Sequence, residues 1–273
     1  MRIEAEIVAV GKEILLGDVL DTNSHWLCGQ LTEMSIAVRR VCQVEDDRDI
    51  IAGAVRAAFR RGVDVIVTTG GLGPTGDDMT LEALAQALER DLVDDPLALE
   101  WVRKKYEELT AKEYVDSSAM TSTRKKMARL PVGGEPLRNE VGAAPGVLIE
   151  YSDCIIVSLP GVPEELKDIF TREVRPVLSA LTRGGTYLEW QVTIDCGDES
   201  VLAPLLVTVN EKWPEVYVKS RARRFGPDIK FLVTLSAVGD DESEVESLLT
   251  SAWRNLRQAL TREEIKVLDV IRD

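Results

Sequence analysis

Two adjacent carboxylates follow a glycine-rich turn in the chain. Residues 65–80 have the sequence VIVTTGGLGPTGDDMT, which predicts a buried β-branched strand, a glycine turn, and a helix preceded by Asp77 and Asp78. Backbone N–H groups at such a turn attract phosphate. A carboxylate beside that phosphate is repelled, however, because two like unit charges about 4 Å apart repel by roughly 4 kcal/mol at an effective dielectric of about 20. A divalent cation removes this conflict, because carboxylates hold the cation and the cation bridges the phosphate oxygens. The pattern therefore predicts a site for a metal-bound phosphate.

Two other interpretations of this turn stay open, and a third, the P-loop, fails. Residues 71–76, GLGPTG, match the G-x-G-x-x-G pattern of dinucleotide-binding folds, although the pattern follows the third predicted strand and the aspartates would repel a diphosphate. The same spacing fits a P-loop, except that Asp77 and Asp78 replace the Lys and Ser or Thr that hold phosphate and magnesium. The two aspartates could also serve only to cap the helix and complement its dipole. The glycines and threonines before them favour a ligand site.

Three more loops follow predicted strands: GKEILLGDVLDTN at residues 11–23, QVEDD at 43–47 and LPGVPEEL at 159–166. The carboxyl ends of parallel strands meet at one edge of a sheet, so acidic side chains from these loops are expected on one patch, as a hydrated metal ion requires. Surface solvation explains any one of them alone, and a helix start led by Pro163 explains the last loop at least as well. The candidate site residues are Glu13, Gly17, Asn23, Asp46, Gly70, Gly71, Gly73, Thr75, Asp77, Asp78, Gly161 and Pro163.

Alternating strands and helices must position these loops. The order predicts an α/β fold with an open, doubly wound, mostly parallel sheet and helices on both faces, which binds ligands beyond the carboxyl ends of its strands. Residues 139–170 predict a turn, two strands, a second turn and a helix. The other predicted strands are 3–10, 36–44 and 63–69, joined by a loop at 11–22, and the predicted helices are 23–34, 49–61, 79–89 and 96–109.

The pattern changes after residue 185 and predicts a second, smaller α+β domain of ferredoxin-like or KH-like type. Its predicted elements are a strand at 187–194, a helix at 199–212, strands at 216–220 and 229–238, and a helix at 242–260. The expected domains are residues 1–180 and 186–262, followed by a C-terminal tail at 263–273.

Charge and composition exclude several classes of protein. The 47 acidic and 33 basic residues give a net charge of −14, which repels nucleic acid. The polar stretch 110–130 concentrates Arg124, Lys125 and Lys126, a pattern more typical of a solvated helix face than of a phosphate contact. No signal peptide or membrane span is predicted, so we expect a cytoplasmic protein without a membrane partner.

The sequence lacks the residue patterns of zinc sites, redox sites and catalytic triads. Four cysteines are scattered singly, without the close pairing of a zinc or redox site, and are expected as small core residues in a reducing compartment. The only histidine, His25, lies beside Trp26 on a predicted helix and is expected to pack there. The sequence therefore predicts no Ser/His/Asp or Cys/His constellation.

Five segments together resemble the molybdopterin-binding fold of MogA and MoeA, in the version carried by the competence/damage-inducible protein A (CinA) family. They are AVGKEILLGDVLDTNS, VEDD, TTGGLGPTGDDMT, GAAPG and LPGVPEEL, in family order between residues 9 and 166. Lys12, Ala143 and Val162 depart from the family pattern, which has a small polar residue, a threonine and a second proline there. The departures concern substrate contacts rather than the fold.

The resemblance implies an activity and two residue roles. In this family the domain is linked to metal-dependent hydrolysis of ADP-ribose-like nucleoside diphosphates, and a related domain fused to FAD synthase is linked to FAD hydrolysis. In the molybdopterin enzymes, aspartates in loops similar to VEDD and GGLGPTGDD serve magnesium and adenylyl transfer. By motif position these are Asp46 and Asp78. Full-length bacterial members add an amidohydrolase domain, which we expect this chain to lack.

We therefore predict a nucleotide pyrophosphatase that uses Mg²⁺, Mn²⁺ or Co²⁺. Its small-molecule ligand is a nucleotide, or a pterin if the chain instead binds or adenylylates molybdopterin. A non-catalytic binding scaffold is the remaining alternative. We also expect association into a homo-oligomer.

The hypothesis assigns roles to the candidate residues. The diphosphate lies over the three turn glycines and receives a hydrogen bond from Thr75. Asp46 and Asp78, aided by Asp77, hold the metal, and Glu13 orients the attacking water as a base. Asn23 positions the loop or a phosphate.

Overall fold

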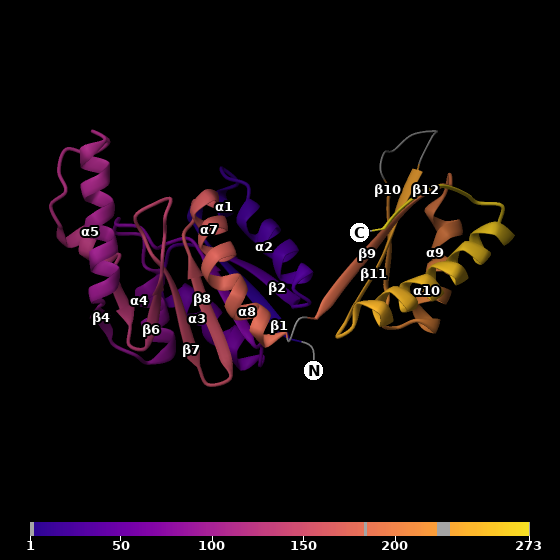
Figure 1. Ribbon diagram of the computed structural model, residues 1–273, viewed down its shortest axis with the longest axis horizontal. Coiled ribbons are helices and arrows are strands. Elements are labelled where there is room, and N and C mark those ends of the chain that lie inside the picture. Colours follow the sequence, from indigo (N-terminus) through magenta and orange to yellow (C-terminus); the bar gives the residue numbers. More distant parts are fainter. Residues whose placement is uncertain (1–2, 183–184, 223–229, 273) are drawn as a thin grey trace. The chain divides into compact units, whose positions relative to one another are not determined.

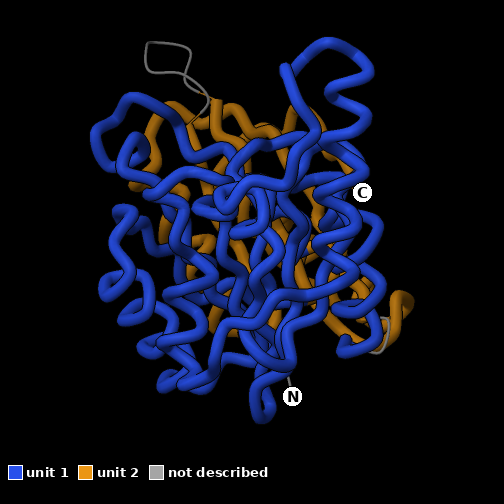
Figure 2. The backbone as a smooth tube through the Cα atoms, turned by 90° about the vertical axis from the view of Figure 1, so that its left-hand side faces the viewer, with its two compact units in different colours: residues 1–32, 36–182 blue, residues 33–35, 183–273 orange. Residues whose placement is uncertain are grey.

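The computed structural model describes residues 3–182, 185–222 and 230–272. The chain forms two compact units, residues 1–32 with 36–182 and residues 33–35 with 183–273 (Figure 2). No helix within the described ranges is long and apolar enough to cross a bilayer.

The first unit is built on a six-stranded sheet with the order β2-β1-β3-β8-β7-β6 (Figure 1). Strands β2, β1, β3 and β8 are parallel, whereas β7 is antiparallel to both of its neighbours. Because β2 and β3 lie on opposite sides of β1, the strand order reverses there. The predicted doubly wound, mostly parallel sheet is confirmed. Its strands are β1 Glu4–Val10, β2 Ala37–Val44, β3 Val65–Thr69, β6 Gly134–Leu137, β7 Gly146–Tyr151 and β8 Cys154–Leu159.

Helices cover both faces of this sheet (Figure 1). Strand β3 is buried along its whole length, as its β-branched sequence predicts for a central parallel strand. On one face, α3 and α4 pack with side chains of the central strands in one apolar cluster. On the other, Trp26 of α2 meets Phe170 edge to face, with ring centroids 5.3 Å apart. The helices are α1 Lys12–Leu16, α2 Thr22–Glu33, α3 Arg48–Arg60, α4 Thr80–Leu88, α5 Pro96–Ala111, α6 Ser122–Lys126, α7 Pro163–Ile169, a π-helical turn Phe170–Val174 and α8 Arg175–Leu181.

Short elements depart from the sequence predictions. The loop predicted after β1 contains helix α1, which buries no residue and so leaves no apolar periodicity in the sequence. The polar stretch 110–130 contains α6 and reaches β5, Arg129–Pro131, which pairs with β4, Leu92–Asp94. Strands of three or four residues are too short for a recognisable alternation.

The second unit has an antiparallel sheet with the order β10-β11-β9-β12. Its β-α-β-β-α-β order is the ferredoxin-like, split βαβ arrangement, one of the two predicted types. The predicted tail is wrong, because residues 266–272 form an edge strand paired to β9; most of this strand is exposed, which hides it in the sequence. Residue 229, the predicted start of one strand, and residue 273 lie outside the described ranges. The elements are β9 Thr186–Asp195, α9 Glu199–Lys212, β10 Tyr217–Ala222, β11 Lys230–Gly239, α10 Glu242–Arg262 and β12 Lys266–Arg272.

Candidate functional site

A cleft of about 420 Å³ lies at the carboxyl ends of the parallel strands. The loops after β1, β2, β3 and β8 all contribute to its walls, and Tyr106 of α5 and Met127 complete them. The strand order reverses at β1, and open α/β sheets bind ligands at such a reversal. The fold therefore places this cleft where a ligand is expected.

The cleft brings together most of the predicted site residues. Asn23 and Pro163 line a smaller adjoining pocket of about 90 Å³, which shares Glu13 and Gly161 with the cleft. Gly17 lies apart, in a shallow depression beside α1 and β2. The predicted residues that line the main cleft are Glu13, Asp46, Gly70, Gly71, Gly73, Asp77, Asp78 and Gly161.

The turn after β3 can be built only from glycine at two positions. Gly70 and Gly71 have φ values of 101° and 67°, in the left-handed region. A Cβ on Gly70 would lie 2.1 Å from the Val10 carbonyl oxygen, and one on Gly71 would lie 2.4 Å from Oγ1 of Thr80. Close packing of this turn against β1 and the start of α4 therefore excludes any side chain.

The N–H groups of the turn differ in what they bind. The Gly70 N–H donates to the carbonyl oxygen of Leu159 at 3.0 Å, so it is already engaged. Within the described residues, the N–H groups of Gly71 and Gly73 have no acceptor. A Cβ on Gly73 would lie 2.6 Å from Oδ2 of Asp78, so this glycine lets the carboxylate approach the turn. Unengaged amides at a turn of this kind can bind an anion.

The two aspartates fold back onto the turn instead of capping α4. Oδ2 of Asp78 accepts hydrogen bonds from the Thr75 N–H at 2.9 Å and from the Thr75 hydroxyl at 2.5 Å. The same hydroxyl also contacts Asp77, whose pKa it holds below the ordinary value. Helix α4 has Met79 at its N-cap and no side-chain cap. The interpretation of the two aspartates as helix caps is therefore wrong. Their carboxylates instead accept hydrogen bonds from the N–H and hydroxyl groups of Thr75.

Lys126 fastens this loop from a distant part of the chain. Its Nζ donates to the carbonyl oxygen of Thr75 at 2.7 Å and also to that of Asp78. Its side chain is only 21% exposed, so the prediction of a solvated helix face is wrong for this residue. Arg124 instead stacks on the Tyr106 ring, 3.7 Å from its centroid. Sequence reasoning missed the role of Lys126 because 48 residues separate it from Asp78.

Two predicted residues are fixed by contacts between loops. Oδ2 of Asp46 accepts from the Lys12 N–H at 2.8 Å, which joins the loops after β2 and β1. Nδ2 of Asn23 donates to Oγ1 of Thr69 at 3.1 Å and to the Gly161 carbonyl oxygen at 2.7 Å. Asn23 thereby ties the start of α2 to the ends of β3 and β8.

Glu165 is a cleft residue that the site prediction left out. It lies in the first turn of α7, lines the cleft, and accepts a 2.6 Å hydrogen bond from Nδ2 of Asn139. Burial raises the pKa of its carboxyl above the ordinary value. In the sequence it is only one of two acids at a helix start, and neither its burial nor its partner has a local signal.

The cleft contains carboxylates of the kind that bind magnesium in proteins. Among the described residues, no three His, Cys, Asp or Glu side chains are grouped to hold one ion. Asp46 and Asp78 line the same cleft from different loops. Magnesium is commonly held by one or two carboxylates, several waters and substrate phosphates rather than by an all-protein cage. The donor set therefore matches that cation without forming a closed site.

Comparison with known proteins agrees with the fold of the first unit. Residues 6–180 match the sequence model of a domain family, MoCF_biosynth, described as "Probable molybdopterin binding domain". A protein of Pyrococcus abyssi is 39% identical over 246 residues, which are 90% of this chain and 94% of that protein. A protein of Aeropyrum pernix is 40% identical over 247 residues, 89% of each chain.

A solved structure adds a comparison of the folds. It is the crystal structure of a Thermoplasma acidophilum protein described as "CinA with unknown function". It is 36% identical and superposes with a TM-score of 0.58, covering 64% of this chain and 97% of that one. The similarity to CinA is therefore seen in both sequence and structure.

Proposed function

We propose, since the chain belongs to the molybdopterin-binding domain family and resembles CinA, that it is a metal-dependent hydrolase of nucleoside diphosphates such as ADP-ribose. One observation carries the proposal. Asp46 and Asp78, from the loops after two parallel strands, line a single cleft with Gly71 and Gly73, whose N–H groups are unengaged within the described residues. Carboxylates and anion-binding amides in one cleft suit a ligand that consists of phosphate and a divalent cation.

Each part of the cleft has a role in this proposal. Asp46 and Asp78 would hold the cation, which, when bound, lowers the pKa of a water and neutralises charge on the phosphates. The N–H groups of Gly71 and Gly73 would donate hydrogen bonds to phosphate oxygens. Lys126 and Thr75 keep the loop in the conformation that presents these groups. The chain thus supplies binding and orientation before any reaction begins.

Product analysis tests the proposal directly. Purified protein with Mn²⁺ or Mg²⁺ should release AMP from ADP-ribose or FAD, and EDTA should stop the release because the phosphates then lose their bridging cation. Chromatographic quantification of AMP measures the rate. Hydrolysis that survives both EDTA and Asp78→Asn would rule out the metal role.

The family description favours a second candidate, a protein that binds or adenylylates molybdopterin in the same cleft. Calorimetric titration with molybdopterin and with ADP-ribose separates the two. Tight pterin binding without ADP-ribose turnover supports the second candidate. A ligand at 100 times its dissociation constant stabilises the folded state by about 2.7 kcal/mol, so a melting temperature that no nucleotide or pterin changes would instead support a scaffold.

A further inference from the structure

We propose, on the basis of the hydrolase function above, that Glu165 is the base that takes a proton from the attacking water. The sequence pointed to Glu13 for this role. The Glu13 carboxylate lies so close to Gly11 that a Cβ there would be 2.4 Å from Oε1, and its side chain is exposed. Glu165 is half-buried at the cleft and held by a dedicated partner, so its environment suits a base better.

The two oxygens of Glu165 have different surroundings. Oε2 accepts the 2.6 Å hydrogen bond from Asn139. Oε1 has no hydrogen-bond partner among the described residues and is not among their buried unsatisfied atoms. Because the side chain lines the cleft, Oε1 is the oxygen that water in the cleft can reach.

Asn139 uses its complete hydrogen-bonding capacity in one orientation. Its Nδ2 also donates to the Ala144 carbonyl oxygen at 2.8 Å. Its Oδ1 accepts from the N–H groups of Val141 at 3.1 Å and Gly142 at 2.7 Å. The amide cannot flip without losing these bonds, so its N–H stays directed at Glu165.

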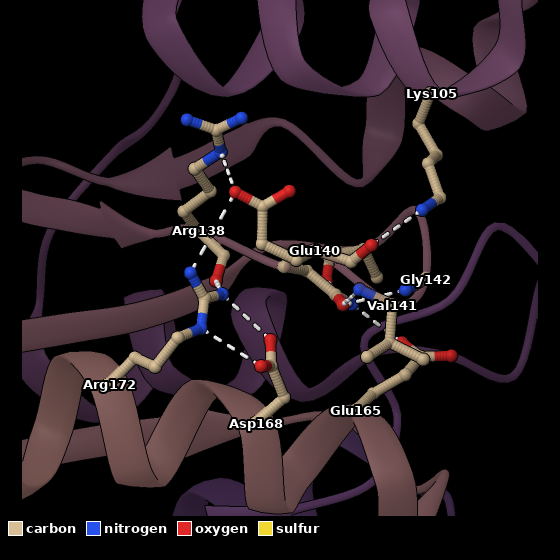
Figure 3. Close-up of polar contacts among 10 residues, drawn as sticks. Lys105, Arg138, Glu140, Val141, Gly142, Glu165, Asp168 and Arg172 are labelled. Atoms are coloured by element: carbon tan, nitrogen blue, oxygen red, sulfur yellow. Dashed lines mark hydrogen bonds and ion pairs between the residues drawn. The ribbon is translucent and has the colours of Figure 1, made fainter. Parts of the chain in front are cut away.

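Charged side chains from two helical segments brace the turn that carries Asn139 (Figure 3). Lys105 of α5 donates to the carbonyl oxygen of Glu140 at 2.8 Å. Arg172 of the π-helical turn donates to the Arg138 carbonyl oxygen at 3.3 Å and forms an ion pair with Asp168 at 2.7 Å. Arg138 also pairs with the Glu140 carboxylate at 2.8 Å. Hydrogen bonds and ion pairs from the neighbouring helical segments therefore hold Asn139, the partner of Glu165, in position.

Gly142 provides the space in which the carboxyl lies (Figure 3). A Cβ on this residue would be 2.1 Å from Cδ of Glu165. The close contact removes water from one side of the carboxyl. The neighbouring Ala143 and Ala144 continue the same wall of the cleft.

The environment of Glu165, its burial above all, raises the pKa of its carboxyl, and this suits a base. Burial raises the pKa of Glu165, and Glu164 in the same helical turn adds to the rise. The Asn139 amide and the Lys105 ammonium act in the opposite direction. Across the cleft, the acids Glu13, Asp46, Asp77 and Asp78 face the same space. A base is most effective when its pKa approaches the working pH.

Glu165 accepts one proton during the hydrolysis of the diphosphate. The water oxygen forms a bond to phosphorus while one water proton passes to Oε1 of Glu165. The bridging P–O bond breaks, and its electron pair leaves with the departing phosphate. Glu165 then returns the proton to solvent, and two phosphate monoesters are released.

Kinetics of Glu165→Gln, with Glu164→Gln as the matched control, test this role. A lost base costs about 10²- to 10⁴-fold in rate, so Glu165→Gln should lower kcat at least about 100-fold with KM little changed. Glu164→Gln, measured at a pH above the acidic limb, should stay within about twofold, because its carboxylate does not line the cleft and only adds to the pKa of Glu165. Thermal melting and circular dichroism show whether both variants are folded, and Glu165→Asp supplies a second variant.

The pH dependence of the activity distinguishes a base from a residue that only supports the fold. Activity should fall as the pH decreases through the pKa of Glu165, and Asn139→Ala should move this acidic limb to higher pH because it removes a bond that favours the carboxylate. Carbon-13 NMR titration of the Glu165 carboxyl, identified by its loss in Glu165→Gln, should shift the same way. An active wild type with an unaffected Glu165→Gln rate, or an acidic limb that Asn139→Ala leaves in place, overturns the role of Glu165 alone. A wild type that cleaves no nucleoside diphosphate overturns the proposed function and this inference together.

Discussion

The tripeptide Gly-Asp-Asp occurs in both units, at residues 76–78 in the first and 239–241 in the second. In the second unit, Asp241 is the N-cap of α10, and its carboxylate accepts from the Glu244 N–H at 3.0 Å. In the first unit, α4 begins without a side-chain cap, and Asp78 folds back onto Thr75. Identical residues before a helix therefore have different partners in the two units.

The residues before each tripeptide explain the difference. Gly239 is the last residue of β11 and Asp241 immediately precedes α10, so the carboxylate lies at the helix start and satisfies an otherwise unpaired N–H group. Residues 76–78 end a loop at the carboxyl edge of a parallel sheet, where neighbouring loops converge. Of the two acidic pairs, the one that lines the cleft is the one whose preceding loop belongs to such an edge.

The largest expected contrast is in catalysis. Asp78→Asn should lower kcat/KM for ADP-ribose hydrolysis at least about 100-fold, because it removes the carboxylate that we propose holds the cation. Asp241→Asn, the matched control in the second unit, should stay within about twofold, because an asparagine can still cap a helix. Initial rates at saturating Mn²⁺ measure both. Equal losses in the two variants would contradict the distinction between the two tripeptides.

A smaller contrast concerns the glycine of each tripeptide. A Cβ on Gly239 would lie 2.7 Å from Cγ2 of Val245, whereas nothing lies within 4 Å of one on Gly76. Overpacking costs roughly 1–3 kcal/mol, so Gly239→Ala should lower the free energy of unfolding by about that amount and Gly76→Ala should leave it nearly unchanged. Urea unfolding followed by tryptophan fluorescence measures both. A Gly239→Ala protein that is as stable as Gly76→Ala would contradict the packing difference between the two positions.

The smallest expected effect is on helix capping. Asp241→Ala should lower the melting temperature by a few degrees, because it leaves an N–H of α10 without its partner. The Ser243 hydroxyl holds the pKa of Asp241 below its ordinary value. The carboxylate therefore stabilises the fold above the ordinary pKa, and this contribution disappears as the pH falls through the lower folded-state pKa. The melting temperatures of the wild type and Asp241→Ala should therefore converge in that acidic range. A difference that persists there would contradict the stabilising role of the Asp241 carboxylate.

Much of the fold was predictable because its signals are local. The β-branched run of β3 and the apolar faces of α3 and α4 appear in the sequence as continuous or periodic patterns. Helix α1 and strands β4, β5 and β6 were missed because they are short, and β12 because it is a largely exposed edge strand. Predictions failed where an element buries too little apolar surface to leave a pattern.

The sequence by itself determined the glycine turn, the acids beside it and the alternation of strands and helices that brings four loops to one edge. Only the tertiary structure decided that Asp78 binds Thr75 instead of capping α4, that Lys126 fastens the loop, and that Asn139 holds Glu165. The physical reason is the range of the contacts. A turn or a helix face depends on residues a few positions apart, whereas the last two of these contacts join residues 26 to 51 positions apart. Only the completed packing of the sheet and its helices brings those side chains within hydrogen-bonding distance.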